Sequence, residues 1–291
     1  MVLLMNGINQ AIAFSPPNRI PRRIVQIYSV AENQPHELPL ICRVSVTNVR
    51  ILHPSFEHVL FDRFRIESFM EREFPQYKVI FDSFQFPIQR FDLFRYLAVY
   101  RLGGFYLDLD ILLTRSLEPL LECYCVFAFE EMTISSFLRD EHNMDWELAN
   151  YGFGAIAGEP FVGAVIDSCI RGVEEPLWSV KAMSGIPRWF REQFFVPVST
   201  GPGMVSRTFS ESHEFRRNMT VLFPTNVLNL STCQQFGSFG VHLMQSSWRR
   251  RFGLIRVRFA RIWEINRRKI FMKRSFALGS RRIGDWSHFS K

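Results

Sequence analysis

Short apolar runs separated by longer helical segments characterise the first third of the chain. Residues 24–28 form a β-rich run, and further apolar runs follow at residues 58–62 and 78–81. Strands that alternate with helices are typical of an α/β fold with a parallel central sheet. We therefore predict strands at these three segments and an α/β fold class.

The clearest helix is predicted at residues 89–102. Its apolar positions recur at three- and four-residue steps, and Gly103 and Gly104 follow it as a stop. Asp92 and Arg95 are three residues apart, so they share one face of this helix.

Strict alternation of apolar and polar residues predicts a strand at residues 105–112. Tyr106, Asp108 and Asp110 would share one side of that strand. Neighbouring carboxylates repel each other, and a hard divalent cation relieves the repulsion. An isolated Asp-x-Asp is most often a solvent-facing pair. Here the pair stands among Leu, Phe and Ile, where an unpaired charge costs on the order of several kcal/mol, so we expect a metal or a basic partner.

Later segments give weaker signals. A glycine-rich stretch at residues 150–160 is expected to interrupt regular structure, and residues 199–203 are expected to form a turn before another helix. Residues 221–224 and 241–244 should each begin or end a strand.

Composition excludes several classes of protein. A chain that is 47% hydrophobic and 22% charged can bury a large core, so it is neither disordered nor fibrous. The five cysteines are too scattered for a disulfide framework and should be reduced. Because we find no basic leader and no run of roughly 20 apolar residues, we expect neither a signal peptide nor a transmembrane helix, and a cytoplasmic location, with peripheral membrane attachment left open.

The net charge of +7 is unevenly distributed. Residues 249–291 hold fourteen Lys and Arg against two acids, a local charge of +12, which leaves −5 for residues 1–248. Within this tail, residues 249–274 predict a basic amphipathic helix. It could pack on the body of the protein or lie on an anionic membrane surface. Nucleic acid binding ranks last, because no recognised nucleic-acid-binding fold accompanies the helix.

A combination of motifs resembles glycosyltransferase family 32, a family of DXD-containing sugar transferases. The chain has Asp92-Leu-Phe-Arg95, then Gly103-Gly-Phe-Tyr-Leu-Asp-Leu-Asp110, at the family's spacing. Residues 20–28, Thr200-Gly-Pro202 and His242 to Trp248 also resemble family landmarks, so the likeness covers residues 20–248. The family includes fungal mannosyltransferases and is distantly related to glucosylating bacterial toxins.

The resemblance implies a GT-A fold, a Rossmann-like sheet that binds a nucleotide sugar. It further implies a retaining, metal-dependent glycosyltransferase that uses a UDP- or GDP-sugar and a glycan or glycolipid acceptor. We expect a lead-in at residues 1–19, a catalytic domain at residues 20–248 and a basic helical tail at residues 249–291.

The resemblance also implies a metal site. Mn²⁺, or Mg²⁺, would be held by Asp110 with help from Asp108, and His242 would add a further contact to the metal or to phosphate.

The remaining site residues implied by the resemblance contact the donor. Asp92 and Arg95 would orient the donor sugar, and Tyr28, which stands where the family has Trp, would stack on the base. Ser247 and the indole N–H of Trp248 would donate hydrogen bonds to the diphosphate.

Two alternatives from other classes are weaker. A phosphohydrolase of the haloacid-dehalogenase type would need Thr two residues after the second aspartate, where this chain has Leu112. A catalytically inactive module that binds sugar nucleotides or membranes would not need intact Asp-x-x-Arg and Asp-x-Asp motifs.

Overall fold

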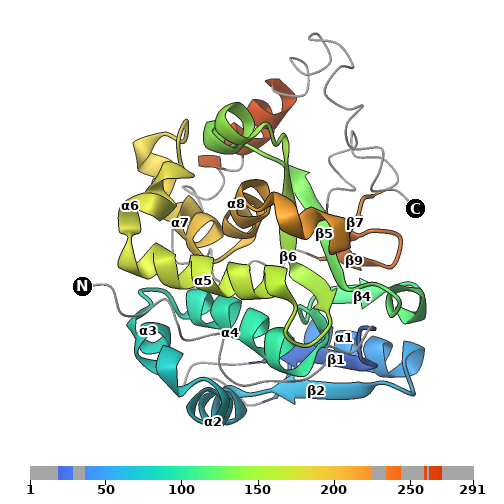
Figure 1. Ribbon diagram of the computed structural model, residues 1–291. Coiled ribbons are helices and arrows are strands. Elements are labelled where there is room, and N and C mark those ends of the chain that lie inside the picture. Colours follow the sequence, from blue (N-terminus) through green and yellow to red (C-terminus); the bar gives the residue numbers. More distant parts are fainter. Residues whose placement is uncertain (1–18, 29–36, 225–233, 244–258, 261, 271–291) are drawn as a thin grey trace.

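A six-stranded sheet forms the centre of the protein (Figure 1). The computed structural model describes residues 19–28, 37–224, 234–243, 259–260 and 262–270. The strand order is β2-β1-β3-β6-β5-β7. The bounds are β1 Arg23–Ile27, β2 Glu57–Phe61, β3 Gly104–Leu107, β5 Cys125–Met132, β6 Trp146–Ala155 and β7 Met219–Leu222.

Most neighbouring strands of this sheet run parallel. β1 is parallel to β2 and β3, and β5 is parallel to β7, whereas β6 runs antiparallel to both β3 and β5. This α/β architecture with a mostly parallel central sheet confirms the predicted fold class. The antiparallel strand β6 is compatible with that class, which requires only a mostly parallel sheet.

Helices cover one face of the sheet, and Phe94, Phe153 and Phe161 belong to the core between them and the strands. The helices of this layer are α2 Arg63–Glu73, α3 Lys78–Ser83, α4 Pro87–Leu102, α5 Pro160–Glu174 and α8 Pro202–Glu211.

The other face packs against α1 and a second, three-stranded sheet of order β4-β9-β8. These elements are α1 Leu40–Leu52, β4 Ile111–Leu113, β8 Gln235–Phe236 and β9 Gly240–His242. The remaining helical elements are α6 Pro176–Lys181, α7 Arg191–Ser199, and the short turns η1 Pro75–Tyr77, η2 Glu118–Leu120, η3 Phe137–Glu141, η4 Arg188–Phe190 and η5 His213–Asn218.

The strands predicted at residues 24–28 and 58–62 and the helix predicted at 89–102 are confirmed within about two residues, as β1, β2 and α4. The strand predicted at residues 78–81 is wrong, because this segment is helix α3. Phe81 is buried while Val79 is 80% exposed, and Lys78 Nζ pairs with Asp82 Oδ2 at 2.6 Å across one helical turn.

Two other predictions are corrected. The strand expected at residues 105–112 ends at Leu107, a turn follows, and the chain then enters β4 of the second sheet. The glycine-rich stretch after Asn150 does not interrupt β6, which continues to Ala155. Gly154 lets the strands pack, since a Cβ there would lie 2.4 Å from the Phe105 ring.

The junction between α4 and β3 requires glycine. Gly103 and Gly104 have φ values of 65° and 107°. A Cβ on Gly104 would lie 2.6 Å from the carbonyl oxygen of Arg23. The chain can therefore turn from α4 directly into β3, beside β1, which brings the polar face of α4 close to the end of β3.

The helical residues 259–260 and 262–270 pack on the body, next to the segment around η3 (Figure 1). The Trp263 ring centroid lies 5.8 Å from that of Phe190, and Arg267 Nε donates to Ile134 O at 3.2 Å. Arg268 Nε donates to Met132 O at 2.9 Å. In its described part, the predicted amphipathic helix thus adopts the first interpretation, packing on the body; residues 249–258 and 271–274 lie outside the described residues.

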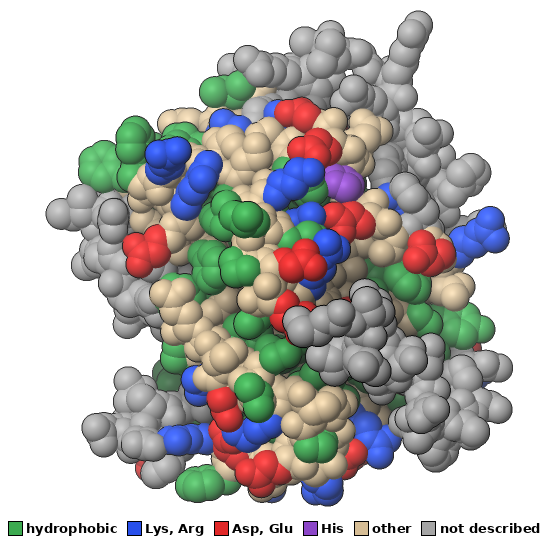
Figure 2. All heavy atoms as spheres, turned by 60° about the vertical axis from the view of Figure 1, so that its left-hand side comes forward, with side chains coloured by type: hydrophobic (Ala, Val, Ile, Leu, Met, Phe, Trp, Pro, Cys, Tyr) green, Lys and Arg blue, Asp and Glu red, His purple; other side chains and the backbone are tan. Residues whose placement is uncertain are grey.

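The face of the molecule in Figure 2 carries mixed charge. On the face in Figure 2, basic and acidic side chains lie intermixed around exposed apolar ones. None of the helices in the described part of the chain is both long and apolar enough to cross a membrane.

Candidate active site

The turn after β3 carries the two predicted carboxylates. Its backbone is held from two sides: Asp108 N donates to Tyr151 O of β6 at 2.7 Å, and Leu243 N donates to Asp110 O at 2.9 Å. Ile111 pairs with His242 across β4 and β9. Two segments far from the turn in sequence, one at Tyr151 and one at His242 and Leu243, therefore converge on it.

Asp108, Asp110 and His242 form a possible metal site. One ligand atom from each lies within 4.8 Å of the other two, and His242 Nε2 is 3.2 Å from Asp110 Oδ1. Their side chains keep 26%, 15% and 13% of their surface exposed, respectively, so the site stays open to solvent. Two carboxylates and an imidazole are a donor set that fits a divalent cation such as Mn²⁺.

The charges at this site favour an added cation. Burial raises the pKa of Asp108, and the neighbouring Asp110 raises it further, while Arg95 acts in the opposite direction. Burial alone would lower the pKa of His242, but the Asp110 carboxylate outweighs it and the pKa is raised. A proton on His242 relieves the carboxylate repulsion here, and a metal ion would do the same more strongly.

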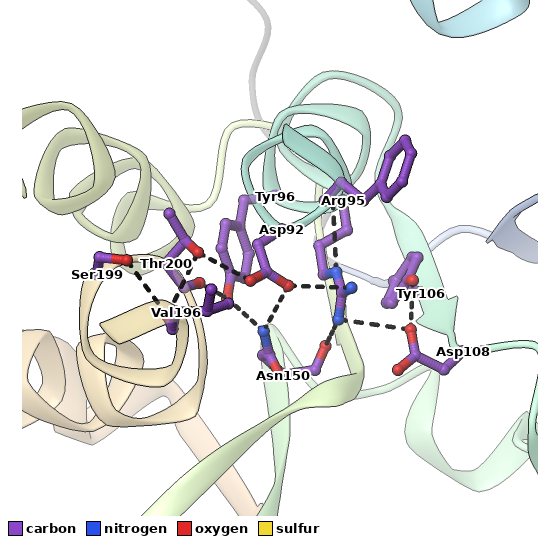
Figure 3. A network of polar contacts seen from close by, with 10 residues as sticks. Asp92, Arg95, Tyr96, Tyr106, Asp108, Asn150, Val196, Ser199 and Thr200 are labelled. Atoms are coloured by element: carbon purple, nitrogen blue, oxygen red, sulfur yellow. Dashed lines mark hydrogen bonds and ion pairs between the residues drawn. The ribbon is translucent and has the colours of Figure 1, made fainter. Parts of the chain in front are cut away.

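A buried network behind this site is centred on Asp92 (Figure 3). Arg95 Nη2 lies 3.0 Å from Asp92 Oδ1, Asn150 Nδ2 donates to the same oxygen at 3.1 Å, and Thr200 Oγ1 donates to Oδ2 at 2.8 Å. Burial raises the pKa of Asp92 to about 6 even though these partners lower it. Asn150 Nδ2 and Thr200 O also contact the Tyr96 hydroxyl, at 3.1 Å and 2.8 Å.

Arg95 links this network to the metal site. Its Nη1 donates to Asn150 O at 2.9 Å and lies 3.4 Å from Asp108 Oδ1, while its Cζ is 4.7 Å from the Tyr106 ring centroid. The Tyr106 hydroxyl donates to the same Asp108 oxygen. Burial acts to lower the pKa of Arg95, but the two carboxylates raise it, so the guanidinium stays charged.

The structure brings together five of the eight predicted site residues: Asp92, Arg95, Asp108, Asp110 and His242. Tyr28 directly follows β1. The end of β1 lies beside the end of β3, because the two strands are parallel and their register pairs Val25 with Tyr106. The Tyr28 hydroxyl donates to Glu37 O at 3.1 Å. Ser247 and Trp248 lie outside the described residues.

Sequence reasoning missed four residues of the site: Asn150, Tyr151, Thr200 as a partner of Asp92, and Gln234. The sequence places Thr200 in a turn that resembles a family landmark and Asn150 in a glycine-rich segment, and neither pattern predicts a contact with Asp92. The signal that could have found Asn150 and Tyr151 is the pairing of β6 with β3, which no local pattern reveals.

Residues 41–127 match a family described as "Glycosyltransferase sugar-binding region containing DXD motif". This match confirms the resemblance inferred from Asp92, Arg95, Asp108 and Asp110, all of which lie inside it.

Similar proteins include mannosyl phosphorylinositol ceramide synthase CSH1 of Saccharomyces cerevisiae, 29% identical over 163 residues, which are 56% of this chain and 39% of that protein. Inositol phosphoceramide mannosyltransferase 3 of Schizosaccharomyces pombe is 40% identical over 70 residues, 24% of this chain and 20% of that protein. The chain thus aligns with less than half the length of these relatives. Among solved structures, the PaToxG glycosyltransferase has a TM-score of 0.42 at 13% identity, over 67% of this chain and 71% of that chain.

Proposed function

We propose that this chain is a retaining, metal-dependent glycosyltransferase that moves a sugar from a UDP- or GDP-sugar to a glycan or glycolipid. The observation that carries the proposal is the joining of the Asp108, Asp110 and His242 cluster to the buried Asp92 network through Arg95. The names of the relatives favour mannose as the sugar and an inositol phosphoceramide as the acceptor.

In this proposal Asp110, Asp108 and His242 hold a divalent cation, Mn²⁺ or Mg²⁺. The cation supplies Lewis-acid stabilisation of the negative charge that grows on the leaving diphosphate. Arg95 holds Asp108 in place and keeps a fixed positive charge beside the donor. Ser247 and Trp248, which lie outside the described residues, would add hydrogen bonds to the diphosphate.

The donor would be oriented by Arg95, Asp92 and Tyr28. The Asp92 carboxylate is engaged by Arg95, Asn150 and Thr200, so it would act on the sugar mainly by fixing the guanidinium of Arg95. Tyr28, at the neighbouring strand end, would stack on the base.

Residues 249–274 would give access to a lipid acceptor: the described part packs one face on the body and would rest its exposed face on an anionic membrane surface. In the described part of this segment, Phe259, Ile262 and Ile270 are 62%, 50% and 50% exposed. Replacing these three by Ser should reduce flotation of the full chain with anionic liposomes. Equal flotation of the variant would remove the membrane from the proposal.

The decisive experiment measures hydrolysis of UDP- and GDP-sugars with and without Mn²⁺. We expect turnover to depend on Mn²⁺ and to fall to background in Asp110→Ala. Metal-dependent turnover retained in that variant would refute the assignment. Thermal-shift titration of the two donor classes, with Mn²⁺ present, then identifies the base.

A further inference from the structure

Gln234 lies between the candidate metal ligand His242 and a carboxylate of the central sheet. Its Oε1 is 3.0 Å from His242 Nδ1, and its Nε2 donates to Glu130 Oε1 at 3.2 Å. The same Nε2 is 3.5 Å from Glu130 O. Both ends of the Gln234 amide are therefore engaged.

Glu130 determines which end of the amide faces which partner. Both contacts with Glu130 are made by Gln234 Nε2, and the backbone oxygen of Glu130 can only accept a hydrogen bond, so the NH₂ end of Gln234 faces Glu130. The carbonyl end then faces His242, and it can only accept from the ring. His242 Nδ1 must therefore carry the hydrogen.

A neutral imidazole protonated at Nδ1 has its lone pair at Nε2. In His242 that atom points toward Asp110, 3.2 Å from its Oδ1, inside the candidate metal site. We propose that Gln234, held by Glu130, is a positioning residue that fixes His242 in the Nδ1–H form, so that Nε2 is presented to a divalent cation. This inference rests on the proposed function only in taking Asp108, Asp110 and His242 as the cation site.

The plane of the ring is fixed independently. The Tyr151 ring stacks on His242 with centroids 4.3 Å apart and planes inclined by 23°. The Tyr151 hydroxyl donates toward Gln235 O at 3.1 Å, and His242 N donates to Gln234 O at 3.0 Å. Because stacking fixes the plane and not the tautomer, the amide of Gln234 has a separate task.

The test measures Mn²⁺ affinity from the electron paramagnetic resonance signal of free Mn²⁺ during titration of the full chain. Loss of a partner that orients a metal-bound histidine typically weakens metal binding by about 10–100-fold, and we expect this in Gln234→Leu. Gln235→Leu is the matched control, since the Gln235 side chain has no hydrogen bond to another described residue.

Exchanging the side chains at positions 130 and 234 distinguishes loss of His242 orientation from loss of packing. In Glu130→Gln with Gln234→Glu, the amide at position 130 can donate to the carboxylate at 234, whose second oxygen accepts from His242 Nδ1. Gln234→Glu alone sets two carboxylates side by side. We expect the double variant to bind Mn²⁺ within about threefold of wild type and each of Gln234→Leu and Gln234→Glu to bind at least about tenfold more weakly.

Binding by Gln234→Leu within threefold of wild type, or no Mn²⁺ binding by the wild-type chain, overturns the inference. If thermal melting shows that Gln234→Leu is unfolded, the Mn²⁺ affinity of the double variant is compared with that of Gln234→Glu. Equally weak Mn²⁺ binding by these two variants overturns the inference. Because the readout is binding, Mn²⁺ binding without sugar-nucleotide turnover would refute the proposed function alone.

Discussion

Glu147 should make the protein less stable as pH rises. Glu147 is 9% exposed, and its carboxyl accepts from Thr133 Oγ1 at 2.6 Å. It lines one cavity with Glu131 and Glu264, and both of these pair with Arg268. Burial raises the pKa of Glu147 from its ordinary 4.5 to about 7. The folded state therefore binds this proton more tightly than the unfolded state does. Its contribution to stability is complete below pH 4.5 and is lost as pH rises through about 7.

A shift of that size corresponds to about 3 kcal/mol, since one pKa unit is about 1.4 kcal/mol. Glu147→Gln keeps an acceptor for Thr133 and removes the charge. We expect the variant to melt about 5 °C above wild type at pH 8 and close to wild type at pH 4.5, by differential scanning calorimetry. Thr133→Val removes a hydrogen bond that lowers the pKa of Glu147. The protein with this substitution should therefore lose more of its melting temperature between pH 4.5 and pH 8 than wild type does. If Glu147→Gln raised the melting temperature equally at pH 4.5 and at pH 8, the reasoning would be refuted.

Four further substitutions test the packing and the site. Arg268→Met leaves buried carboxylates without their cation and should cost about 3–5 kcal/mol, seen as a lower melting temperature. Gly104→Ala and Gly158→Ala both place alanine at positive φ, but a Cβ meets a carbonyl oxygen at 2.6 Å only at the first site. Gly104→Ala should therefore melt well below Gly158→Ala, and equal melting would contradict this. Arg95→Lys cannot reproduce the forked contacts of the guanidinium, so turnover should fall about 10²-fold with a smaller loss of stability; unchanged kcat would count against its role.

Local patterns were sufficient where the determinants are close in sequence. The periodicity of residues 89–102 and the Gly103–Gly104 stop predicted α4 and its end, because helix spacing and positive φ are properties of the segment itself. The spacing of Asp108 and Asp110 predicted a pair of neighbouring carboxylates, although the two residues occupy a turn rather than a strand.

Local patterns failed where tertiary contacts decide. Val79, Ile80 and Phe81 form a β-rich run, but the segment is a helix in which Phe81 is buried, Ile80 is partly buried against the core and Val79 is exposed. Asn150 reaches Asp92 because antiparallel pairing sets Gly152 opposite Leu107. That register depends on residues about 50 positions apart in sequence, so no window around Asn150 carries the information.

The formal charges of the assembled site explain why a divalent cation suits it. Asp92, Asp108 and Asp110 carry three negative charges, and Arg95 returns one positive charge, so a neutral His242 leaves two negative charges uncompensated among these residues. The Gln234 amide accepts from His242 without adding a charge, whereas a carboxylate in its place would raise the excess to three. A divalent ion therefore balances these residues when Glu130 and Gln234 together carry one negative charge. Exchanging their side chains keeps that sum, whereas Gln234→Glu alone adds a charge, which is a physical reason for glutamine beside Glu130.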